Sequence, residues 1–317
     1  MKPFDNEARA RESVIRAALG MAGAGLVVNK AGNVSARCEE GGRTAFLITP
    51  SGMDYESLRP ADLSLIYWDD GTKQWVHSGP HKPSSEWLMH AEIYRAHPGW
   101  GGVVHTHSPR ATVLACRQTP IPAFHYMVAA SGGEDIPCAK YALFGTPELA
   151  RNVLEALKER RCCLIARHGV VAAGSDVSQA LSLAVEVENL ASMYIELLAL
   201  GPAEVLTKDQ MREVLEKFSA YEDNSRRLSR REPAQTRSDG MPLWKYADGR
   251  NISCTEKVKV LDENFREIGR LMADALDDAV LIGCPSEQYR RALENLAAGL
   301  KSRYPDQNPE ENSRGGA

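Results

Sequence analysis

Three histidines have the type and spacing that metal chemistry requires. His105 and His107 end the apolar run GGVVHTH, and side chains two residues apart in a strand lie on the same face, so both imidazoles can reach one ion. His168 follows the apolar run CCLIAR at a His-Gly turn, where a side chain projects from the end of a sheet. Three neutral imidazoles with an open fourth position suit a catalytic Zn²⁺. For the His105 and His107 pair alone, two hydrogen-bonded structural histidines remain the alternative.

Three short segments combine small and hydroxyl residues in a way that suits an anion such as phosphate. They are residues 32–35 (GNVS), residues 49–52 (TPSG) and the pair Ser84 and Ser85 at the start of a predicted helix. Each segment is also common as an ordinary turn or helix cap. Glu86 directly follows the serines, and it is either a first-turn acid that the helix dipole favours or a neighbour of the metal.

The other histidines have no spacing that suggests a ligand set. We interpret them as surface residues or as core residues with satisfied hydrogen bonds. This group consists of His77, His81, His90, His97 and His125.

The hydrophobic pattern that must position these residues alternates between short β-rich runs and helical spacing. Thr146 with Pro147 and Thr207 with Gln210 are typical helix starts. The alternation predicts an α/β fold. We expect strands at 44–49, 63–68, 101–107, 162–167 and 170–173, and helices at 7–22, 84–97, 146–160, 177–200 and from 207 onward.

The composition changes after Tyr221. Residues 224–240 hold five arginines against two acids and almost no large apolar side chains, which is typical of a solvated linker. Two amphipathic helices are predicted beyond it, and because two helices cannot bury a core alone they must pack on the main domain, a neighbouring subunit or a partner. We therefore expect a main domain at 1–222, an Arg-rich linker at 223–247, a helical extension at 248–304 and a polar tail at 305–317.

Composition and charge limit the classes of protein and partner. Of the 317 residues 43% are hydrophobic and 25% are charged, as in a soluble globular chain. A net charge of −4 gives no positive field for nucleic acid or an anionic membrane, so we expect neither as a partner. Seven cysteines without a C-x-x-C pair, and no signal peptide or membrane-length apolar run, favour the cytoplasm.

From residue 8 to Tyr221 the chain resembles the class II aldolase/adducin family. The segments AGNVS, LITPSG, PSSEW, VVHTHS, IPAFHYMVAASGGEDIPCAKYALFGT, RHG and VLEKFSAY occur in the family's order. Within the family the resemblance to L-fuculose-1-phosphate aldolases is stronger than that to the ribulose-phosphate 4-epimerases. It implies one α/β domain with a central, mostly antiparallel sheet flanked by helices, to which this chain adds a C-terminal helical extension. It also implies a homotetramer whose active sites lie between subunits.

The resemblance also implies roles for individual residues. Zn²⁺ would be held by His105, His107 and His168, with Glu86 as a fourth ligand in the absence of substrate and as the residue that moves protons. Tyr126, reaching in from the adjacent subunit, would give a proton to the departing aldehyde. The phosphate would be held by Gly32, Asn33, Ser51, Gly52, Ser84 and Ser85, while Phe144 would line the aldehyde side and Tyr221, with Phe218, would close over the site.

The activity that this resemblance implies is a zinc-dependent cleavage of a ketose 1-phosphate like L-fuculose 1-phosphate. The products would be dihydroxyacetone phosphate and a small aldehyde like L-lactaldehyde. A related metal-dependent lyase, decarboxylase or sugar-phosphate epimerase on the same fold is the alternative. A non-catalytic interaction module like adducin is a more distant one, because that reading predicts lost histidines and all three are present.

Overall fold

The computed structural model describes residues 7–40, 43–229, 237, 241–246, 250–300 and 302. Contacts between Cα atoms divide the chain into two compact units, Met1–Asn224 and Ser225–Ala317. The first unit carries every residue for which the sequence predicts a functional role.

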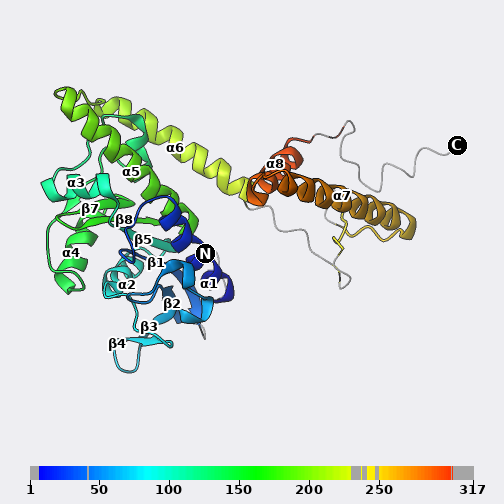
Figure 1. Ribbon diagram of the computed structural model, residues 1–317, viewed down its shortest axis with the longest axis horizontal. Coiled ribbons are helices and arrows are strands. Elements are labelled where there is room, and N and C mark those ends of the chain that lie inside the picture. The colour runs from blue at the N-terminus through cyan, green and yellow to red at the C-terminus, as the bar shows by residue number, and fades with distance from the viewer. Residues whose placement is uncertain are drawn as a thin grey trace. The chain divides into compact units, whose positions relative to one another are not determined.

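The first unit is built on one eight-stranded sheet in the order β4-β3-β2-β1-β5-β8-β7-β6 (Figure 1). Neighbouring strands are antiparallel except for β6 and β7, which are parallel. The strands are β1 (Asn33–Glu40), β2 (Arg43–Ile48), β3 (Ser64–Asp69), β4 (Gln74–Ser78), β5 (Gly102–Thr106), β6 (Cys138–Ala139), β7 (Cys162–Ile165) and β8 (Gly169–Gly174).

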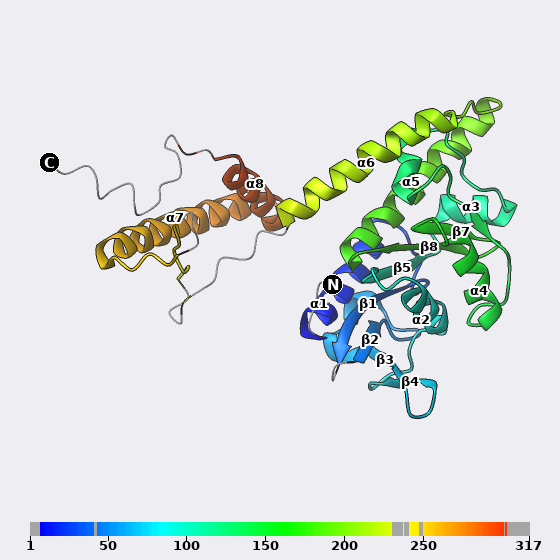
Figure 2. The ribbon, with the colours of Figure 1, turned by 180° about the vertical axis from the view of Figure 1, so that it is seen from behind.

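Helices cover both faces of the sheet, and each face has its own apolar core (Figure 2). Because side chains alternate along a strand, Leu164 and Val170 join the core beneath α5, whereas Ile165 and Val171 join the core beneath α2 and α4. On the first face lie α1 (Glu7–Gly23), α3 (Pro109–Arg117) and α5 (Val177–Leu200), and on the second lie α2 (Trp87–Ala96) and α4 (Pro147–Ala156).

The observed elements confirm the predicted fold class. The two predicted helix starts form as expected: the Thr146 hydroxyl accepts from the Leu149 amide, and Thr207 and Gln210 bond each other's backbone reciprocally. The strands β1, β4 and β6 and the helix α3 were not predicted. Three short 3₁₀ helices, at Tyr55–Ser57, Pro60–Asp62 and Tyr126–Ser131, complete the first unit.

The end of the first unit differs from the prediction at the linker. Helix α6 (Lys208–Ser229) continues through residues 224–229, which composition alone assigns to a solvated linker. Of the predicted linker beyond Ser229, the described residues are Arg237 and 241–246. The predicted polar tail, 305–317, lies outside the described residues.

The second unit contains the two predicted helices, α7 (Thr255–Leu281) and α8 (Ser286–Gly299). Its main polar anchor is Asp262, which is buried on α7 and accepts hydrogen bonds from the Arg237 guanidinium and from Trp244 Nε1, the latter at 2.7 Å. Trp244 also packs edge-on against Phe265. Among the helices of the described chain, none is long and apolar enough to cross a membrane.

The two units are expected to be independent in stability. Both apolar cores of the first unit are formed by residues up to Phe218, so a chain that ends at Asn224 loses none of the described core residues. We expect its thermal unfolding midpoint to stay within about 4 °C of that of the same unit in the full chain, since about 1 kcal/mol corresponds to 2–4 °C for this size. Calorimetry of both chains tests this, and a drop beyond about 10 °C would contradict it.

Candidate metal centre

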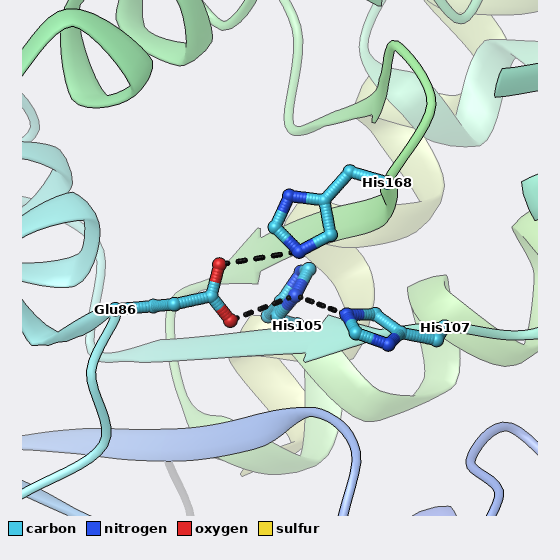
Figure 3. A group of neighbouring side chains, drawn as sticks. All are labelled: Glu86, His105, His107 and His168. Carbon is cyan, nitrogen blue, oxygen red and sulfur yellow. Dashed lines mark hydrogen bonds and ion pairs between the residues drawn. The ribbon is translucent and has the colours of Figure 1, made fainter. Parts of the chain in front are cut away.

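The sheet and two turns bring four potential ligands together on the α2 face. His105 is the penultimate residue of β5, His107 directly follows that strand, and His168 lies in the turn between β7 and β8. Because β5 pairs with β8, the ends of these two segments are adjacent. Glu86 enters from the residue before α2, and Figure 3 shows its carboxylate pointing at the three imidazoles.

The ligand atoms of these four residues all lie within 4.8 Å of one another. Glu86 Oε2 is 3.1 Å from His105 Nε2, and Glu86 Oε1 is 3.3 Å from His168 Nε2 (Figure 3). His105 Nε2 is also 3.1 Å from His107 Nε2. In a tetrahedral zinc site, Zn–N distances of about 2.0–2.1 Å put neighbouring ligand atoms about 3.4 Å apart, which is within the observed range.

The backbone fixes the tautomer of the central histidine. His105 Nδ1 lies 2.8 Å from the Val170 carbonyl oxygen, which can only accept, so this nitrogen carries a proton. In the neutral ring Nε2 is then a bare lone pair aimed at Glu86 and His107. Such a hydrogen bond from the far nitrogen is the usual support for a histidine that ligates a metal.

The pKa values of the four residues indicate that the cluster favours a positive charge between them. Burial lowers the pKa of His107 and of His168 to about 4, so both rings are neutral at pH 7. Burial acts against the charge of Glu86 and of His105 too, but the attraction between the two outweighs it: the pKa of His105 is raised and that of Glu86 is held well below its usual range. The lone pairs therefore converge on a point that a proton or a metal cation must occupy.

The donor set fits a divalent metal ion. Three imidazole nitrogens and one carboxylate are ligands that zinc accepts, and in the described residues Glu86 Oε1 is buried without a hydrogen-bond donor. A bound cation would satisfy this oxygen.

Asn33, the first residue of β1, and Gly32 just before it support the centre. Gly32 has a φ of +96°, and a Cβ there would lie 2.6 Å from the His105 carbonyl oxygen, so the chain passes too close to β5 for a side chain. Asn33 pairs in register with His105, and its Nδ2 donates to Glu86 Oε2 at 3.0 Å. The sequence assigned Asn33 to phosphate alone. Its contact with Glu86 was not foreseen.

The two serine-containing loops predicted to bind phosphate lie side by side. The Ser51 amide donates to the Lys82 carbonyl at 2.9 Å, and the Ser84 amide donates to the Thr49 carbonyl at 3.1 Å. Ser51, Gly52 and Ser85 are exposed, whereas Ser84 is buried and its hydroxyl accepts from the Glu86 amide. The anion-binding role of these residues stays a prediction, but the loops adjoin the Glu86 ligand.

The predicted aromatic residues lie outside the group of four ligands. Tyr126 is 51% exposed, with its ring centroid 6.5 Å from that of Phe218 on α6. Phe144 is 58% exposed, and the following Gly145 packs against the Ser85 carbonyl, so this loop borders the serines. Tyr221 is part of α6, but its side chain falls outside the described residues.

The remaining histidines were interpreted as surface or satisfied core residues, and four of the five fit that description. His77 is exposed on β4, His81 contacts Asp62, His97 stacks on Trp100, and the His125 ring accepts from a backbone amide. The exception is His90, which is fully buried beside the centre with one ring nitrogen unpaired in the described residues.

Comparison with known proteins assigns this chain to a family. The family model described as "Class II Aldolase and Adducin N-terminal domain" matches residues 12–195. The chain belongs to this family, and it is an enzyme of the class II, metal-dependent aldehyde-lyase type.

Among the individual proteins that this chain resembles are aldolases that act on different sugar phosphates. A 5-methylthioribulose-1-phosphate/5-deoxyribulose-1-phosphate aldolase of Rhodospirillum rubrum is 48% identical over 215 residues, which are 68% of this chain and 93% of the relative. An L-fuculose phosphate aldolase of Escherichia coli O6:H1 is 43% identical over 66% of this chain and 93% of its own. A solved L-fuculose 1-phosphate aldolase has a TM-score of 0.63 and 32% identity, over 68% of this chain and 98% of that one.

Loss of a ligating imidazole should empty the centre without unfolding the sheet. We expect His107→Ala and His168→Ala to bind Zn²⁺ more than 100-fold more weakly, since even substitutions behind the ligands typically cost 10–100-fold. His77→Ala, exposed on β4, is the matched control. Metal content after dialysis against a chelator checks this, and stoichiometric zinc in both ligand variants would rule out the assignment.

Proposed function

We propose that this chain is a zinc-dependent aldolase that cleaves a ketose 1-phosphate into dihydroxyacetone phosphate and a small aldehyde. The observation that carries the proposal is the convergence of Glu86, His105, His107 and His168 on one point, next to two hydroxyl-bearing loops. The metal would be held by the three histidines, with Glu86 as a fourth ligand. A bound Zn²⁺ would supply a Lewis acid that stabilises negative charge on a substrate oxygen.

Glu86 is the group that moves a proton in this proposal. Cleavage of the C3–C4 bond leaves the three-carbon fragment with an electron pair on C3, which must take up a proton. The Glu86 carboxylate lies beside the histidines that would hold the metal, so it can accept that proton in the condensation direction and return it to C3 in the cleavage direction.

The loops around Ser51 and Ser84 would orient the substrate through its phosphate. The residues proposed to bind it are Gly32, Asn33, Ser51, Gly52, Ser84 and Ser85, since backbone amides and side-chain donors bind phosphate without a metal. Because the Ser51 and Ser84 amides already donate to backbone carbonyls, these two serines would contribute their hydroxyls. Holding the phosphate there would place the first three substrate carbons near Glu86, because Glu86 follows Ser85 directly.

The aldehyde end of the substrate is proposed to lack a terminal hydroxyl. The names of the relatives share this feature, since fuculose, 5-deoxyribulose and 5-methylthioribulose all end in an apolar group. The loop beside Ser85 presents the apolar side chains of Leu143 and Phe144 to its surroundings, which suits such an end.

Two further parts of the proposal concern the assembly. Tyr126 is exposed and is not among the four ligands. In the site of an adjacent subunit of a homotetramer it would take the proton of the C4 hydroxyl as the aldehyde departs, and return it to the aldehyde oxygen in the condensation direction. Tyr221 would close over the site. All seven cysteines are free, which fits the reducing cytoplasm that we propose as the location.

Product release tests the substrate directly. We expect the purified protein to release dihydroxyacetone phosphate from L-fuculose 1-phosphate or 5-deoxyribulose 1-phosphate, and chelation to abolish the release until Zn²⁺ is restored. Coupled reduction by NADH and a glycerol-phosphate dehydrogenase measures it. Turnover to a different product, such as CO₂ or an epimerised sugar, would instead favour a decarboxylase or an epimerase on the same fold.

The role of Glu86 has its own test. Glu86→Gln keeps the shape and the hydrogen bond from Asn33 but cannot take up a proton. We expect it to retain zinc through the three histidines and to lose turnover by about 10²–10⁴-fold, the usual size of a general acid–base contribution. Steady-state kinetics at measured zinc content decides, and wild-type rates would remove Glu86 from the mechanism.

A further inference from the structure

The side chains of β1 that face α2 are polar, although those on the opposite side of the strand are apolar. The other side of β1 is formed by Val34, Ala36 and Cys38, which are buried in the apolar core beneath α1 and α5. On the side toward α2, β1 carries a polar residue at every second position. Facing them, polar residues recur every four positions along α2 and the residue before it. These facing residues are Asn33, Ser35 and Arg37 on β1, and Glu86, His90 and Tyr94 at or on α2.

Hydrogen bonds join the two elements in three steps along this interface. Nearest the centre, Asn33 Nδ2 donates to Glu86 Oε2 at 3.0 Å. Next, the single hydroxyl of Ser35 lies 2.7 Å from His90 Nδ1 and 2.8 Å from the Tyr94 hydroxyl. We call Ser35, His90 and Tyr94 the hydroxyl bridge.

The third step holds the end of the helix. The Arg37 guanidinium donates to the carbonyl oxygens of Tyr94, His97 and Trp100, and lies 4.9 Å from the centroid of the Tyr94 ring. The Tyr94 carbonyl lies in the last turn of α2, and those of His97 and Trp100 lie just after it. Carbonyl groups at the end of a helix have no donor within the helix, and Arg37 supplies one.

The hydroxyl bridge is buried to a degree that is costly for polar groups. Ser35 and His90 are completely buried and Tyr94 is 2% exposed. His90 Nε2 has no hydrogen-bond partner within the described residues, and burial together with the nearby His105 lowers the pKa of His90 to about 3, so the ring stays neutral. Apolar side chains would pack here at lower cost, so the bridge is not explained by stability alone.

The hydrogen bonds between β1 and α2 constrain the placement of the helix, because they are directional. One hydroxyl bonded to two side chains a helical turn apart restricts both the rotation of α2 and its position along β1, because a hydrogen bond depends on direction as well as on distance. Glu86 immediately precedes α2, so a displacement of the helix would also displace the Glu86 carboxylate. A shift of 1 Å would change its 3.1 and 3.3 Å distances to His105 and His168.

We propose that Ser35, His90 and Tyr94 are positioning residues, which hold α2 against β1 so that the Glu86 carboxylate meets the metal held by the histidines. The bridge contacts neither substrate nor metal and acts through the helix. This inference rests on the proposed metal centre, but its test does not require the proposed substrate.

The test uses Co²⁺ in place of Zn²⁺, because the visible spectrum of Co²⁺ reports its ligands. Ser35→Ala removes the shared hydroxyl. We expect its spectrum to shift toward that of Glu86→Gln, its metal affinity to fall about 10–100-fold, and, on a substrate that the wild type turns over, kcat to fall with KM little changed. Ser35→Thr keeps a hydroxyl and should restore the wild-type spectrum and affinity.

A matched control separates positioning from general destabilisation. Ile93→Ala empties a buried apolar position on the same helix, where no polar contact is made. We expect it to lower the melting temperature at least as much as Ser35→Ala while leaving the Co²⁺ spectrum unchanged. If Ser35→Ala does not fold, Tyr94→Phe removes only one of the two bonds and should give a smaller shift in the same direction.

A wild-type spectrum and metal affinity in Ser35→Ala, or in Tyr94→Phe where that variant replaces it, would overturn the inference. An equal spectral change in Ile93→Ala would overturn it as well, because any loosening of α2 would then suffice. If the wild type binds Co²⁺ but cleaves no ketose 1-phosphate, the proposed substrate fails while the spectra still decide the role of the bridge.

Discussion

The hydrogen bond from His105 Nδ1 to the Val170 carbonyl is the contact on which the centre depends. It joins the side chain of one strand to the backbone of its neighbour, and in the neutral ring it leaves Nε2 as a lone pair that faces Glu86 and His107. The pairing of β5 with β8 therefore sets the ring orientation and the tautomer together. The depressed pKa values of His107 and His168 follow from the same enclosure, since these rings lie in a space from which water is largely excluded.

The two faces of strand β1 differ in how they contact their neighbours. The side toward α1 and α5 is apolar and packs into the core beneath these helices. The side toward α2 carries Asn33, Ser35 and Arg37, which form hydrogen bonds with α2 and the residues at its ends. Burying polar groups costs free energy, and the two apolar cores offset that cost from both sides of the sheet. Functional sites are where such departures from simple packing concentrate, because a positioned carboxylate needs directional neighbours.

The fold class and the meeting of His105, His107 and His168 with Glu86 could be predicted from the sequence, but the polar interface behind them could not. His105 and His107 could be paired because strand geometry is local, and His168 joined them because its turn follows an apolar strand. Strand β1 was missed, since GNVSARCEE mixes small and charged residues without an apolar alternation that periodicity detects. Without β1, nothing linked Ser35 to His90, which are 55 residues apart and meet only in the folded sheet.

The row Asn33, His105 and Val171 crosses three strands that are distant in the chain. The loops that must close to form it span 60 residues or more, and each closure costs entropy before any contact offsets it. A ligand set assembled this way has little counterpart in the unfolded chain, so a tightly bound metal ion would bind the native state selectively and slow its unfolding. Loss of a bound metal ion would therefore also lower the stability of the native fold, so the ion would have a structural role beside its chemical one.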